Sequence, residues 1–352
     1  MTDPHEALNP LIRTRRIAVC GGTRINLTNA IFAEALGKQL AAEEGLMLVT
    51  GGFKCFTLDP EIPSGDWSFV SGAREYLRSI GLTTERKIET LLPDPTHEPA
   101  RVVRFREGTV IILKGRSLQS RRFKLVGSVD TLVAIEGAKG TREIIDLALA
   151  LEKPILPLPF TEGVARMRWN ENRKLICEWF EVDKATAKSW EEVSIGELSG
   201  SEVTSLARGV KQHLFHQLRR KCFVMMPFGV EFLPLYEQAI KPALEDAGLL
   251  PIRTDQLDLV GDVVSALHSA IRSAACGLAV ITQNNPNVMY ELGLAHAQGK
   301  PVILLCEIGP EGHDLPNLPY DLQHESVFGY RAGDWPALRS SVAGVLNRLK
   351  GS

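Results

Sequence analysis

One glutamate, Glu291, stands where an isolated carboxylate could do chemistry, in the stretch NPNVMYELGLAHAQGKPVILL. An apolar run, LAVITQ, precedes it, and Asn285, Pro286 and Asn287 separate the two. We expect Asn287 to cap a helix and Glu291 to lie in or near its first turn, where the helix dipole favours an ionised carboxylate. An anion at this place could stabilise or capture the ribosyl cation that forms when an N-glycosidic bond breaks.

NAD⁺ suits a lone carboxylate because its nicotinamide nitrogen already carries a positive charge. Nicotinamide departs neutral and needs no general acid, whereas ordinary glycosides usually need a second carboxylic acid for the leaving group. From position alone, Glu291 could equally have only a structural interaction with the helix N-terminus. We expect His296, on the same helix, to contact solvent or to pack rather than to catalyse.

Three glycine-rich turns follow apolar runs in the first half of the chain. They contain Gly21, Gly22 and Thr23, then Gly51 and Gly52, and then Gly137, Lys139, Gly140 and Thr141. The carboxyl ends of parallel strands converge on one crevice, where glycine lets the backbone approach a phosphate. Glycine is also common in strand–helix turns that bind no ligand. Three such turns at one edge of the sheet nevertheless favour a nucleotide site. Lys139 would add a positive charge to this site, and Thr141 would add a hydroxyl.

Two series of alternating strands and helices must position these residues. The first has strands at 16–22, 46–53, 109–113, 131–137 and 154–160, with helices at 27–44 and 141–152. The second has strands at 221–229, 250–256, 278–283, 301–307 and 325–330, with helices at 232–247, 262–275, 287–298 and 334–350. The fold class is therefore α/β, with two doubly wound parallel-sheet domains, the first Rossmann-like and the second flavodoxin-like.

The length of 352 residues also favours two domains, and 44% hydrophobic residues can supply a core for each. We expect an N-terminal tail over 1–15, a first domain over 16–218 and a second domain over 219–352. The first domain would end in a helical elaboration over 161–218. Three tryptophans in that segment argue against a disordered linker.

Charge and composition exclude several kinds of partner. The formal net charge is −2, and basic and acidic residues are mixed along the chain. The sequence therefore lacks the concentration of positive charge that binds nucleic acid or an anionic membrane. The 6 cysteines are scattered without CxxC spacing, so we expect no metal site. No apolar run reaches membrane-spanning or signal-peptide length, and we therefore expect a cytoplasmic protein.

The stretch SRRFKLVGSVDTLVAIEGAKGTREI resembles the core motif of the LOG family of nucleoside-monophosphate phosphoribohydrolases. That family belongs to the broader SLOG superfamily, whose members include sensors of nucleotide-derived signals. The matching residues are Arg121, Asp130, Gly137, Gly140 and Thr141, and CGGTR and LVTGGF match the upstream glycine turns. The resemblance covers about residues 16–160.

Three positions depart from that motif. Glu136 replaces its proline, Ala138 replaces its second glycine, and Ile144 replaces its final catalytic glutamate, which leaves Glu143 one position early. Without that carboxylate, hydrolysis at the site would be poor. The resemblance then implies a domain that binds a nucleotide signal without cutting it, with Arg121 and Glu143 among the binding residues.

In the second half, KCFVMMPFG, IRTDQ and NPNVMYELGLAHAQGKPVI together resemble the nucleoside 2-deoxyribosyltransferase-like and TIR-like domains of bacterial effectors, over residue 221 to about 307. The resemblance implies that Glu291 is the catalytic carboxylate. It assigns substrate binding to Met226, Pro227, Phe228, Asp255, Asn287 and Tyr290. Ala275 and Val280 stand where the family often has aspartates, which disfavours free nucleosides as transferase substrates.

The two resemblances together imply a nucleotide-regulated NAD⁺ glycohydrolase that acts as an effector in defence against phage. The signal would be a cyclic ADP-ribose derivative or a cyclic oligonucleotide, NAD⁺ would be a substrate and no cofactor would be needed. We expect a homo-oligomer, because both fold types commonly assemble. Two alternatives stay open: a non-enzymatic nucleotide-binding sensor or scaffold, and a nucleotide-salvage enzyme, either a phosphoribohydrolase or a deoxyribosyltransferase.

Overall fold

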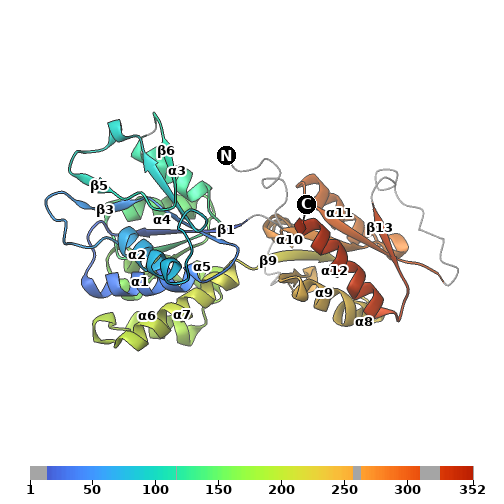
Figure 1. Ribbon diagram of the computed structural model, residues 1–352. Helices are drawn as coiled ribbons and strands as arrows, with labels where there is room; N and C mark the ends of the chain where they lie inside the picture. The colour runs from blue at the N-terminus through green and yellow to red at the C-terminus, as the bar shows by residue number, and fades with distance from the viewer. Residues whose placement is uncertain (1–13, 116, 257–262, 310–325, 352) are drawn as a thin grey trace. The chain divides into compact units, whose positions relative to one another are not determined.

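A computed structural model describes residues 14–115, 117–256, 263–309 and 326–351 of the chain (Figure 1). These residues form two compact units, a first unit over Thr14–Leu218 and a second unit from Arg219 onward. Each unit has a parallel sheet with helices packed on both faces. The expected α/β class with two doubly wound domains is therefore confirmed.

The sheet of the first unit has six parallel strands in the order β6-β4-β2-β1-β7-β8. The strands are β1 (Arg15–Gly21), β2 (Leu46–Thr50), β4 (Ile88–Pro93), β6 (Thr109–Leu113), β7 (Thr131–Ile135) and β8 (Ile155–Pro157). The chain runs outward from β1 to β6 and then returns to β7 on the other side of β1. Ligands of such sheets bind where the strand order reverses, which here is the carboxyl edge between β1 and β7.

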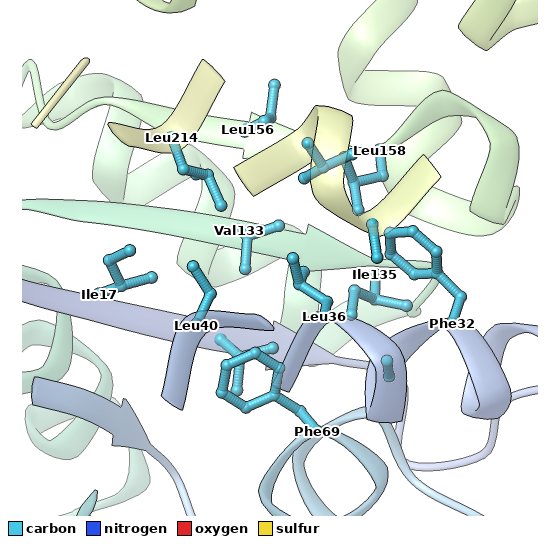
Figure 2. Packing of buried hydrophobic residues seen from close by; sticks show 14 of the residues in the cluster. Ile17, Phe32, Leu36, Leu40, Phe69, Val133, Ile135, Leu156, Leu158 and Leu214 are labelled. Atoms are coloured by element: carbon cyan, nitrogen blue, oxygen red, sulfur yellow. The ribbon is translucent and has the colours of Figure 1, made fainter. Parts of the chain in front are cut away.

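Seven α-helices of the first unit are described: α1 (Leu27–Ala41), α2 (Gly65–Ser79), α3 (Leu118–Gly127), α4 (Lys139–Ala150), α5 (Gly163–Phe180), α6 (Lys184–Glu192) and α7 (Gly200–Gln217). Figure 2 shows Leu36 and Leu40 of α1 and Phe69 of α2 against the strand residues Ile17 and Val133. This apolar packing is the main source of the unit's stability.

Helices α1 and α2 approach each other closely at two glycines. A Cβ atom on Gly37 would lie 2.0 Å from the carbonyl oxygen of Phe69, and one on Gly72 would lie 2.0 Å from the carbonyl oxygen of Glu34. Only residues without a side chain fit at these positions.

The segment between β2 and β6 contains elements that the sequence did not indicate. The expected strand over 46–53 ends at Thr50, because Gly52 has φ +71° and turns the chain. A short antiparallel pair then joins β3 (Phe53–Phe56) to β5 (Val102–Arg104), and α2 and β4 lie between them. The apolar pattern did not predict strand β4, because Glu89 interrupts its apolar run. The buried Glu89 forms an ion pair with Arg16 of β1.

The second unit has five parallel strands in the order β10-β9-β11-β12-β13. Its elements are β9 (Arg220–Met225), β10 (Leu249–Ile252), α10 (Val263–Ser273), β11 (Cys276–Val280), α11 (Pro286–Ala297), β12 (Val302–Glu307), β13 (Val327–Tyr330) and α12 (Trp335–Gly351). The expected flavodoxin-like order, in which the second strand in sequence lies outside the first, is confirmed. Asp262, the expected start of α10, lies outside the described residues.

The expected regular helix over 232–247 is wrong in detail. A 3₁₀ turn (Val230–Phe232) leads into α8 (Leu233–Leu235), a π-helical segment (Tyr236–Ile240) and α9 (Lys241–Asp246). Pro242 has no backbone N–H and cannot continue a regular hydrogen-bond ladder, which accounts for the irregularity before it. Within the described part of the chain, no helix has the length and apolar character needed to cross a membrane.

Candidate functional site

Glu291 lies on α11, and its side chain is buried, with the residue only 6% exposed. Its Oε1 atom accepts a hydrogen bond of 2.6 Å from the hydroxyl of Thr254, which follows β10. Among the described residues, no cation pairs with Glu291. The carboxylate is thus buried with the support of one neutral donor.

Burial raises the pKa of Glu291 above its ordinary value, and this effect is larger than the opposing effect of the Thr254 hydrogen bond. The negative charge of Asp255 raises the pKa further. A carboxylate held without a neutralising cation gains free energy when a positive charge develops beside it. Once ionised, Glu291 could therefore stabilise a cation that develops beside it.

The start of α11 differs from the expectation in one respect. Asn285, not Asn287, caps the helix: its Oδ1 accepts hydrogen bonds from the backbone N–H groups of Asn287 (3.0 Å) and Val288 (3.4 Å). Pro286 takes the first helical position, where its missing N–H costs nothing. Glu291 consequently falls in the second turn, where the helix dipole acts weakly. Burial, rather than the dipole, dominates its electrostatics.

Arg253 and Thr254 are two residues of this region that the sequence analysis did not single out. Arg253 is 4% exposed, and its Nη2 donates a hydrogen bond of 2.7 Å to Oδ2 of Asp255. Its guanidinium carbon lies 4.4 Å from the ring centre of Tyr236 and 6.0 Å from that of Phe228. In the described structure, Nε of Arg253 has no hydrogen-bond partner. The only signal in the sequence was the run RTD, in which arginine and aspartate are two positions apart.

The structure brings some expected substrate residues near Glu291 and leaves others apart. Asp255 is close enough to affect the pKa of Glu291, and the exposed Asn287 lies four residues before Glu291, on the same face of α11. Phe228 is exposed beside Arg253.

The other expected substrate residues lie apart from Glu291. Met226 and Pro227 are buried, with Met226 part of the hydrophobic core, and Tyr290 is exposed on a neighbouring face of α11.

In the first unit, the turns after β1 and β7 meet at the carboxyl edge, as expected. A Cβ atom on Gly22 would lie 3.3 Å from Cα of Gly137, and Gly137 has φ +94°. The hydroxyl of Thr141 donates to the carbonyl oxygen of Gly21 at 3.2 Å, so it fixes the two turns to each other. Lys139, Gly140 and Thr23 lie at the same edge, with Lys139 and Thr23 exposed.

The turn after β7 is held by Glu136, which also has a positive φ of +51°. Its carboxylate accepts hydrogen bonds from Nδ2 of Asn29 (2.6 Å) and the backbone N–H of Asn26 (3.2 Å). Its own N–H donates to Oγ1 of Thr161 at 2.8 Å. Glu136 thus ties the turn to the start of α1, a role that the sequence did not reveal.

Arg121 and Glu143, both expected to bind a nucleotide, do not pair with each other. Arg121 is 7% exposed and lies against Gly51, where an added Cβ would be 2.2 Å from its Nη1. Burial and the neighbouring Arg104 lower the pKa of Arg121 to about 10, against the attraction of Asp66, and the group stays charged at neutral pH. Glu143 instead forms an ion pair with Arg122.

Neither a protein-family model nor a curated protein matches the chain. Among solved structures, the structural genomics target TM1055 matches at 25% identity, over 43% of this chain and 78% of that chain, with a TM-score of 0.32. The molybdenum cofactor binding protein of Rippkaea orientalis matches at 24% identity, over 41% of this chain and 76% of that chain, with a TM-score of 0.30. DNA processing protein A of Helicobacter pylori matches at 16% identity, over 47% of this chain and 75% of that chain, with a TM-score of 0.32.

Each of these matches covers less than half of this chain. At such low TM-scores, the likenesses identify neither a substrate nor a partner. The α/β class rests on the two sheets themselves.

Proposed function

We propose that the second unit is an N-glycosidase with Glu291 as its catalytic carboxylate, and that its substrate is NAD⁺. The observation that carries this proposal is the burial of Glu291 without a described cationic partner, with one oxygen held by Thr254. A carboxylate with only a structural role in a helix would more commonly face solvent or be paired with a cation.

In the proposed reaction, the bond between C1′ of the ribose and the nicotinamide nitrogen breaks. Its electron pair goes to that nitrogen, which becomes neutral, so nicotinamide leaves without a proton. Glu291 stabilises the ribosyl cation or captures it through Oε2, the oxygen that Thr254 does not hold. Water then adds to the free cation or, after capture, displaces Glu291 from C1′, so that the C1′–Oε2 bond breaks and its electron pair returns to the carboxylate. The added water loses a proton to solvent, and ADP-ribose is the second product.

We propose further that the first unit binds a nucleotide signal and controls this activity, in an effector of phage defence. The signal would be a cyclic ADP-ribose derivative or a cyclic oligonucleotide, bound where the turns after β1, β2 and β7 converge. The ion pair between Glu143 and Arg122 supports binding over hydrolysis there, because it leaves no free carboxylate at that position. Control requires that the signal bind the active state more tightly than the inactive state.

The test is to incubate the full chain with NAD⁺, alone and with each of a panel of cyclic and linear nucleotides, and to measure nicotinamide by chromatography. Release in at least one condition supports the proposal. Calorimetric binding of NAD⁺ without any release would instead favour the non-enzymatic sensor. Release of a free base from a deoxynucleoside would favour the deoxyribosyltransferase.

A further inference from the structure

The first unit contains a cavity of about 280 Å³ that lies apart from the glycine turns after β1 and β7. It is formed by the carboxyl ends of β4 and β6 together with the segment that includes β5. Its lining is mostly prolines and aliphatic side chains, with three charged residues: Glu98, Arg104 and Arg106. The cavity adjoins the same edge of the sheet as the turn after β2, since β2 pairs with β4.

Arg104, which is in an ion pair with Glu98, gives this cavity a rigid and flat wall. Its Nε donates to both carboxylate oxygens of Glu98, at 2.9 and 3.0 Å, and its Nη1 donates to the carbonyl oxygen of Gly51 at 2.9 Å. Its guanidinium carbon also lies 5.6 Å from the ring centre of Phe53. A guanidinium held in one orientation is a stacking surface for a planar ring, as for the bases of nucleic acids.

Gly51 connects this wall to Arg121. Arg104 binds the carbonyl oxygen of Gly51, and Arg121 lies against the Cα atom of the same residue. Nε of Arg121 is buried and has no hydrogen-bond partner in the described structure, although the residue is more than nine-tenths buried. A buried guanidinium with an unsatisfied donor is costly unless a ligand completes its hydrogen bonds.

We propose that the cavity beside Arg104 holds the base of a nucleotide whose phosphate is bound by Arg121. The prolines, the aliphatic side chains and the flat wall suit a planar heterocycle, and the unsatisfied arginine suits a phosphate oxygen. The volume is near the lower end of the range of about 300–1,000 Å³ for small-molecule sites, so it matches one base rather than a whole dinucleotide. This inference rests on the proposed nucleotide binding by the first unit and is independent of the chemistry of Glu291.

Ala100 offers a direct test, because it lines the cavity but is exposed and lies outside the strands and helices. Ala100→Trp should fill the cavity, and Ala100→Ser is the matched control. We expect calorimetry on the full chain to show AMP binding to wild type and to Ala100→Ser, weakened at least about tenfold in Ala100→Trp. Inorganic phosphate, which needs no cavity, should bind all three proteins equally.

A second measurement does not depend on the folding of any variant. Photo-crosslinking of the wild-type full chain with 8-azido-AMP should label peptides from residues 92–112, and excess AMP should suppress the label. Absence of AMP binding, equal affinity of Ala100→Trp and wild type, or labelling only elsewhere would each overturn the inference. These results do not depend on nicotinamide release, so a failure of the proposed NAD⁺ activity would be recognised separately.

Discussion

The hydroxyl of Thr254 lies 2.6 Å from Oε1 of Glu291 and donates a hydrogen bond that joins the carboxyl end of β10 to α11. Because this donor is neutral, it orients the carboxylate without cancelling its charge. The bond also lowers the pKa of Glu291, against the larger opposing effect of burial. Thr254 is therefore a positioning residue for the proposed reaction.

Replacing Thr254 by valine should shift the acid limb of the pH–rate profile for nicotinamide release to higher pH. Without the donor, the pKa of Glu291 rises further, and the ionised form that the reaction needs is populated only at higher pH. On the acid limb, kcat/KM should fall roughly tenfold, as for loss of a hydrogen bond to a charged group. Thr254→Ser keeps the hydroxyl and should restore the wild-type profile. Equal loss in both variants, with no shift along the pH axis, would contradict the assignment.

The raised pKa of Glu291 also predicts how stability depends on pH. The folded protein binds the carboxyl proton more tightly than the unfolded chain does, so ionisation destabilises the fold as pH rises through the folded pKa. We expect Glu291→Gln to melt at a higher temperature than wild type at about pH 8. The difference should shrink as pH falls and disappear below the ordinary glutamate pKa of 4.5, where both states are protonated. Calorimetric scans of the two proteins at matched pH measure this, and a lower melting temperature for the variant at the higher pH would show that burial does not penalise the carboxylate.

Arg253→Lys should destabilise the second unit by about 1–3 kcal/mol, because lysine cannot reproduce a buried planar group. The variant loses the stacking on Tyr236 and puts a compact ammonium group in place of the planar guanidinium beside Asp255. Arg339→Lys is the matched control, since Arg339 pairs with Asp246 on the exposed surface of the same unit and should change stability by less than about 1 kcal/mol. Hydrogen exchange of β9 and β10 peptides, resolved by mass spectrometry, compares the two. Similar protection in both variants would mean that the buried Arg253 contributes little to the stability of the second unit.

Glu143→Gln separates the proposed function from phosphoribohydrolase activity in the first unit. Glu143 forms an ion pair with Arg122 in the first unit, whereas Glu291 lies in the second unit, so the variant should change nicotinamide release by less than about twofold. The assay is run in parallel with nucleoside monophosphates, followed by chromatography of the free base. If wild type releases the free base and Glu143→Gln does not, the first unit is a hydrolase that uses Glu143. That result would contradict the interpretation that Glu143 serves only as the ion-pair partner of Arg122.

The sequence predicted those parts of the fold that depend on local patterns. Apolar runs and helical periodicity indicated the central strands of both sheets, and the stretch around Glu291 pointed to its carboxylate. The pattern failed at β4, where the buried Glu89 is paired with Arg16, 73 positions away. A single sequence carries no signal for such a distant partner.

The same limitation applies to the candidate site. Thr254 contacts Glu291 across 37 positions, and a threonine after a strand has no chemical signature of its own. Glu143, expected to bind a nucleotide, instead pairs with Arg122, the neighbour of Arg121 in the sequence. Adjacent helical residues point in different directions, which a motif alone does not resolve. The residue types suggested the chemistry of the site, but which side chains contact one another could be determined only from the fold.

The catalytic role of Glu291 is tested by the initial rate of nicotinamide release by wild type and Glu291→Gln, with saturating NAD⁺ and the nucleotide that activates wild type most. Glu245→Gln, an exposed glutamate on α9, is the control for loss of a carboxylate from the same unit. We predict that kcat falls at least about 100-fold in Glu291→Gln, while NAD⁺ binding and the control's rate stay close to wild type. Equal rates for Glu291→Gln and wild type would show that Glu291 is not the catalytic carboxylate.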